Sequence, residues 1–64
     1  MQVILPDRSR HLLPPDPTLI EDILAALGLN PASVIVIRNG MVVPEDVLAE
    51  GEDELRIIQV SHGG

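Results

Sequence analysis

The chain has 64 residues, with ten acidic side chains against four arginines and no lysine, and a formal net charge of −6. A chain of this length holds one domain with one core. It contains no Cys, Phe, Tyr or Trp, which excludes disulfides and thiolate chemistry and disfavours an aromatic-lined cofactor pocket. We therefore expect a protein that is not an enzyme and that has no cofactor.

The charge and the hydropathy also limit the partners. Phosphate and anionic lipid recognition depends on clusters of Lys and Arg, so we expect neither nucleic acid nor a membrane as partner. The net charge either keeps the chain in solution or attracts a basic protein. There is no apolar run long enough for a membrane span and no signal-peptide pattern, which predicts a cytoplasmic protein. The two histidines, His11 and His62, lie far apart, so we expect no metal site.

The first elements are short. Residues 1–5 form an apolar segment that suits one strand. Residues 6–10 have turn chemistry, and 11–13 can return antiparallel as a second strand. The proline-rich segment 14–17 is a stiff connector.

A helix is expected over residues 18–28. Thr18 and Glu21 have the spacing of a capping box, in which each side chain bonds the other residue's backbone N–H. Gly28 suits the left-handed position that ends a helix, followed by Leu29 in the Schellman pattern. Five aliphatic residues recur at helical spacing and form one apolar stripe: Leu19, Ile20, Ile23, Leu24 and Leu27.

The second half predicts a hairpin and a final strand. The β-branched run 34–37 is followed by Asn39-Gly40, which favours a type I′ turn, and by the return strand 41–43. Residues 45–48 can form one short helical turn, and 55–60 form the last strand.

The order of elements predicts an α+β fold of the ubiquitin-like β-grasp type. One helix would pack across a mixed sheet of four to five strands, with the first and last strands parallel in the middle. We expect a domain over residues 1–60 and a flexible diglycine tail over 61–64.

Several features occur in a fixed order along the chain: Asn39-Gly40, Pro44, the acidic loop around Gly51, an aliphatic last strand and the terminal Gly63-Gly64. In this combination the chain resembles the ThiS/MoaD-like sulfur-carrier family. The segment from Leu27 to Gly40 is most similar to ThiS.

This resemblance implies that an ATP-dependent adenylating enzyme of the ubiquitin-activating type converts Gly64 into an acyl-adenylate. Sulfur then replaces the adenylate, and the thiocarboxylate serves a sulfur-accepting synthase. ThiS-like members supply the thiazole of thiamine, whereas others serve molybdopterin synthesis or tRNA thiolation. Glycines at 63 and 64 let an extended tail enter a narrow channel. His62 completes the tail, without a role that we can derive.

Strand alternation predicts the docking surface. If Leu55 and Ile57 face the helix, the opposite side of the sheet carries an aliphatic patch. Such a patch is typical of a partner-binding face. A shifted register would instead make the same residues core. The predicted partner-binding residues are Ile35, Ile37, Ile58 and Val60.

Two alternative functions remain. The chain can be a ubiquitin-like modifier that is conjugated through Gly64 to target lysines, or a β-grasp interaction domain whose C-terminus is never activated. We expect a monomer when the protein is alone. The acidic residues between 45 and 54 are expected to form a solvated face, with which Arg56 can pair.

Overall fold

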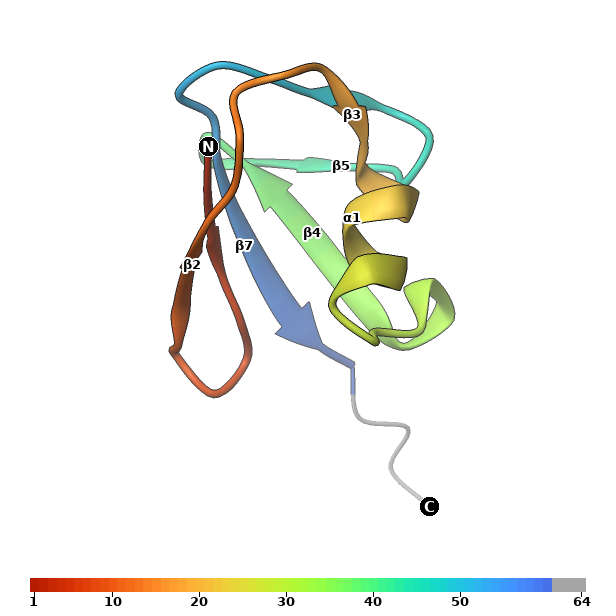
Figure 1. The fold of residues 1–64 in the computed structure, drawn as a ribbon. Helices are drawn as coiled ribbons and strands as arrows, with labels where there is room; N and C mark the ends of the chain where they lie inside the picture. Colours follow the sequence, from red (N-terminus) through yellow and green to blue (C-terminus); the bar gives the residue numbers. More distant parts are fainter. Residues whose placement is uncertain (61–64) are drawn as a thin grey trace.

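The computed structural model describes residues 1–60, which form one mixed sheet covered on one side by a helix (Figure 1). In chain order the elements are β1 (Gln2–Ile4), β2 (Arg10–Leu12), β3 (Thr18–Leu19), α1 (Ile20–Ala26), the 3₁₀ turn η1 (Pro31–Ser33), β4 (Val34–Arg38), β5 (Met41–Val43), β6 (Leu48–Ala49) and β7 (Glu54–Gln59). The main sheet has the order β2-β1-β7-β4-β5, and β1 and β7 are parallel. The predicted β-grasp fold is confirmed.

The core is aliphatic, as the composition requires. Ile20 and Leu24 of α1 are fully buried, together with Val3 of β1 and Leu55 and Ile57 of β7. Burying one such side chain stabilises the fold by about 1.5–3 kcal/mol. Within residues 1–60 the core contains no buried polar side chain, so its stability depends on apolar packing alone.

The start of α1 differs from the prediction. The helix begins at Ile20, and the capping box of Thr18 and Glu21 is wrong because Thr18 belongs to β3 and its hydroxyl donates to the carbonyl of Asp16. The first helical N–H groups instead donate to a neighbouring loop, from Ile20 to the carbonyl of Val47 and from Glu21 to that of Glu45. These bonds satisfy orphan donors that a side-chain cap would otherwise satisfy.

The end of α1 agrees with the prediction. Gly28 has a φ of +74°. Its N–H donates to the carbonyl of Ala25, and the N–H of Leu29 donates to that of Leu24 at 2.8 Å. These two bonds define a Schellman motif.

The hairpin of β4 and β5 is also confirmed, whereas the segment after it is not. Asn39 and Gly40 have φ values of +49° and +87°, as a type I′ turn requires. Residues 45–48 form no helical turn, because Leu48 and Ala49 pair as β6 with β3. This small second ladder holds the loop that caps α1.

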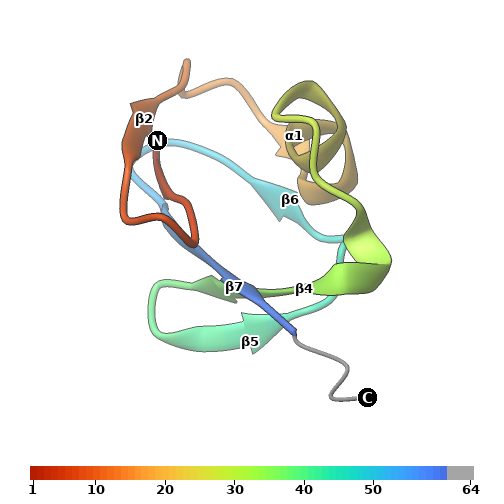
Figure 2. The same cartoon turned by 90° about the horizontal axis from the view of Figure 1, so that it is seen from below.

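The two faces of the main sheet have different surroundings. Seen from below, α1 and β6 lie on one side of the strands β7, β4 and β5 (Figure 2). No helix or strand of residues 1–60 covers the other side. This outer face is where the sequence predicts docking.

Candidate functional site

The outer face of the sheet carries the predicted aliphatic side chains. Ile35 of β4 and Ile58 of β7 are direct cross-strand neighbours and are 41% and 42% exposed. Ile37 and Val60 are half-buried. The inward neighbours Val36 and Ile57 are buried, so the alternation is as expected and the register is not shifted. The role of these residues in docking stays a prediction.

The outer face is larger than the sequence interpretation indicated. Val42 of β5 pairs with Ile37 and is 71% exposed. On the other side Arg56 lies between Ile37 and Ile4 in the strand register. The two-residue turn at Asn39-Gly40 could have revealed Val42, because it fixes the pairing of the hairpin. Ile4 is itself buried, and its place beside Arg56 depends on the register of β1 against β7, which no local sequence signal gives.

The end of the described chain is attached to the rest of the domain. The N–H of Val60 donates to the carbonyl of Ser33 at 2.8 Å, one residue beyond β7. This bond fixes the point from which the chain continues towards its C-terminus. The predicted tail residues His62, Gly63 and Gly64 lie outside the described residues.

A carboxylate at the start of β7 organises the adjoining loops. Asp53 accepts hydrogen bonds from Arg38 Nε at 2.8 Å, from Asn39 Nδ2 at 2.9 Å and from the backbone N–H of Glu50 at 2.9 Å. The bond from Glu50 is the largest of the causes that lower the pKa of Asp53 to about 2, followed by the bond from the Asn39 side chain and the contribution of Arg38. Asp53 therefore connects the hairpin turn and the loop before β7 through its hydrogen bonds, and it does not belong to a solvated acidic face.

The predicted pairing of Arg56 with the acidic segment is not observed. Arg38 makes the ion pair with Asp53, and Arg56 has no ion pair with any residue from 1 to 60. The other acidic residues of the segment are exposed, namely Glu45, Asp46, Glu50, Glu52 and Glu54. The interpretation as a solvated face therefore holds for these five, but not for Asp53.

The part of the chain that the structure describes offers little for other kinds of chemistry. No group of three or more His, Asp or Glu side chains within it could hold a metal ion. No helix there is long and apolar enough to cross a membrane.

Comparison with known proteins identifies the family. Residues 3–61 match the model of the family described as Small archaeal modifier protein 2. An uncharacterized protein of Archaeoglobus fulgidus is 42% identical over 43 residues, which cover 67% of this chain and 63% of the archaeal protein. The chain thus spans less than two thirds of the length of that relative.

The matched family is a ThiS/MoaD-like family with the ubiquitin-like β-grasp fold, which confirms the resemblance read from the sequence. Its members are small modifiers or sulfur carriers and not catalysts, and they work with activating enzymes of the ubiquitin-activating type. Because the match covers nearly the whole sequence and the fold agrees, the chain belongs to the small archaeal modifier protein 2 family.

Proposed function

We propose that this protein is activated at the carboxyl group of Gly64 by an ATP-dependent adenylating enzyme in the cytoplasm. The observation that carries the proposal is the exposed aliphatic outer face. It includes Ile58 on β7, the strand that leads directly to the terminal Gly63-Gly64. The family match supports it, because modifiers and sulfur carriers share this activation.

In the activation step, an oxygen of the Gly64 carboxylate attacks the α-phosphate of ATP. An acyl–oxygen–phosphorus linkage forms, and pyrophosphate leaves. The resulting acyl-adenylate is a reactive acyl donor with AMP as the leaving group. Glycine at this position suits the step because an α-carbon without a side chain allows close approach and has no stereocentre to racemise.

The adenylate has two possible fates. Attack by the amine of a target lysine releases AMP and a proton and forms an isopeptide bond, and the family description favours this modifier role. Attack by sulfide (HS⁻) on the acyl carbon breaks the bond to AMP, which leaves, releases a proton and gives a thiocarboxylate for a sulfur-accepting synthase. The ThiS-like segment from Leu27 to Gly40 favours that role, with the thiazole of thiamine as the first pathway to test.

The outer face is the proposed docking surface for the activating enzyme. Its centre is the exposed pair Ile35 and Ile58, flanked by the half-buried Ile37 and Val60. Exposed aliphatic side chains next to each other gain most by exclusion of water in an interface. Domain 1–60 would then supply affinity, while residues 61–64 would supply the reactive group.

The test combines an in vitro assay with mass spectrometry. With the purified activating enzyme and ATP, we expect pyrophosphate to be released from ATP when the intact protein is added. A variant that lacks Gly63 and Gly64 should give no pyrophosphate, while its circular dichroism spectrum is unchanged. In cells, a Gly64 remnant on lysines of other proteins shows the modifier, and a mass gain for one oxygen replaced by sulfur shows the carrier. A truncated variant that retains full cellular function would establish the third alternative, an interaction domain that is never activated.

A further inference from the structure

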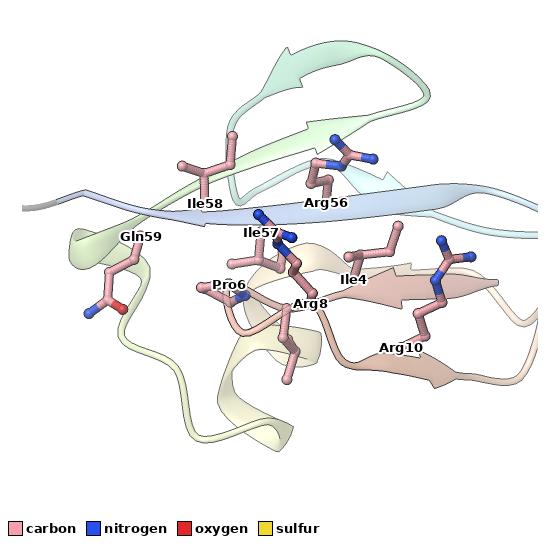
Figure 3. A pocket seen from close by; sticks show the side chains of 9 residues that line it. Ile4, Pro6, Arg8, Arg10, Arg56, Ile57, Ile58 and Gln59 are labelled. Carbon is pink, nitrogen blue, oxygen red and sulfur yellow. The ribbon is translucent and has the colours of Figure 1, made fainter.

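The four arginines of this acidic chain are unevenly distributed. Arg8, Arg10 and Arg56 line one groove between the β1–β2 hairpin and β7, and only Arg38 lies elsewhere. In Figure 3 the side chains of Arg8 and Arg10 extend from the hairpin towards β7, from which Arg56 projects. A chain with net charge −6 therefore has a local concentration of positive charge beside its last strand.

These three guanidinium groups have no carboxylate partners among residues 1–60. The one ion pair found there joins Arg38 to Asp53. The acidic side chain in the hairpin itself, Asp7, accepts its hydrogen bonds from the backbone N–H and the hydroxyl of Ser9. All three groove arginines are exposed, so intramolecular pairing does not explain their position.

The backbone at Arg8 gives a second, independent observation. Arg8 has a φ of +71°, in the left-handed region that glycine or asparagine adopts at lower cost. Its backbone N–H donates to the carbonyl of Leu5 at 2.8 Å and closes the turn of the hairpin. Its side chain makes no hydrogen bond or ion pair with any residue from 1 to 60. A glycine could make the same turn at lower cost, and residues kept in sparsely populated backbone conformations are concentrated at functional sites.

The groove has an apolar floor between its cations. In the strand register Ile4 of β1 lies opposite Arg10 of β2 on one side and Arg56 of β7 on the other. Pro6 and Ile58 continue the apolar lining. The groove is open to solvent, with a volume of about 740 Å³, whereas sites for small ligands enclose most of the ligand.

We propose that this groove binds an acidic segment of a partner protein, with an aliphatic side chain against the exposed Pro6 and Ile58 and carboxylates on either side at the arginines. Arginine binds carboxylates in planar, often bidentate geometry. Nucleic acid fits less well, because the rest of the chain is strongly acidic and has no aromatic side chain on which a base could stack. The proposal depends on the surface of the domain and not on the chemistry of Gly64.

The test uses the intact protein and three probes in nuclear magnetic resonance titrations at pH 7. The first is a capped pentapeptide with a central leucine and two glutamates on each side, and the second has lysines in place of the glutamates. The third is an oligothymidylate. We expect the acidic peptide alone to shift amide signals of β1, β7 and residues 5–10, and its affinity to fall when the salt concentration rises.

Two variants locate the binding. Arg56→Gln and Arg8→Gly should each lower the affinity for the acidic peptide by about two- to fivefold, which is the effect of losing one exposed ion pair. Arg8→Gly is informative because its backbone is better suited to the turn, so a loss of binding cannot be attributed to unfolding. The control is Ala25→Glu on the exposed surface of α1, across the sheet from the groove. It changes the net charge by the same amount, and we expect an unchanged affinity.

The remaining outcomes would overturn the proposal. These are no shift with the acidic peptide at millimolar concentration, equal binding of the acidic and basic peptides, or equal losses in Arg56→Gln and Ala25→Glu. Tighter binding of the oligothymidylate, with displacement of the peptide, would assign the groove to nucleic acid instead.

Discussion

The two faces of the central strand β7 differ in what they contact. Leu55 and Ile57 are 0% and 1% exposed and pack in the core beneath α1, whereas Arg56 and Ile58 alternate with them on the uncovered side. A strand of six residues thus carries both core side chains and part of the proposed binding surface. Adjacent positions in the sequence should consequently give different kinds of defect when they are substituted.

The largest effect is expected for a matched pair of substitutions on the two faces. Ile57→Ala removes buried methyl groups and should destabilise the fold by about 3 kcal/mol, a large share of the stability of so small a domain. Ile58→Ala removes the same atoms from a side chain that is 42% exposed and should cost less than about 1 kcal/mol. Urea denaturation of the two variants gives both values, and equal losses would show that the outer face is also core.

The second prediction concerns Asp53, which belongs to neither face and joins β7 to the β4–β5 hairpin. Its folded-state pKa of about 2 lies below the ordinary value of 3.8, so the folded state favours the charged form. Asp53→Asn should therefore cost about 2 kcal/mol at pH 7.

The pH dependence follows from the same shift. The stabilisation by Asp53 is fully present above about pH 4 and is lost as the pH falls towards 2. The difference in unfolding free energy between the wild type and Asp53→Asn should shrink over that window when urea midpoints are measured. A difference that stays constant from pH 6 to pH 2.5 would mean that the charge of Asp53 contributes nothing.

The third prediction tests whether the outer face binds the activating enzyme. Ile58→Glu places a charge in the proposed interface. It should raise the KM of the activating enzyme for this protein by about tenfold or more, a loss of binding free energy of about 1.4 kcal/mol. Pyrophosphate release at varied protein concentration measures it, with Ala25→Glu on α1 as the control of equal charge. If Ile58→Glu unfolds, Ile58 belongs to the core and the two faces are not separate. If the KM is unchanged, Ile58 is not part of the docking surface.

Local sequence signals predicted the elements that depend on neighbouring residues. The Schellman end at Gly28 and the turn at Asn39-Gly40 require positive φ values that particular residues supply, and both were found. The alternation of Leu55 to Ile58 likewise gave the two faces of β7. In each case the cause lies within a few residues of the effect.

The parts that were missed depend on contacts between distant segments. Thr18 has the sequence of a helix cap, but its pairing with Ala49 in a two-strand ladder places it outside the helix. The parallel pairing of β1 and β7 was expected, but the groove of Arg8, Arg10 and Arg56 also depends on the register of that pairing, which sets Ile4 opposite Arg56 and was not predicted. Charge counts along the sequence give the net value of −6 but not this local reversal.

The smallest predicted effect has the opposite sign. Arg8→Gly replaces a residue at φ +71° by the one that adopts this conformation at least cost, and should stabilise the domain by about 0.5–1 kcal/mol. Urea denaturation measures the gain, and Arg10→Gly on β2 is the control, because glycine in a strand should destabilise. If Arg8→Gly is more stable and yet binds the acidic peptide less well, Arg8 is retained for recognition at the expense of stability. If it is less stable than the wild type, the side chain of Arg8 supports the hairpin, and its conformation is no longer an argument for a binding site.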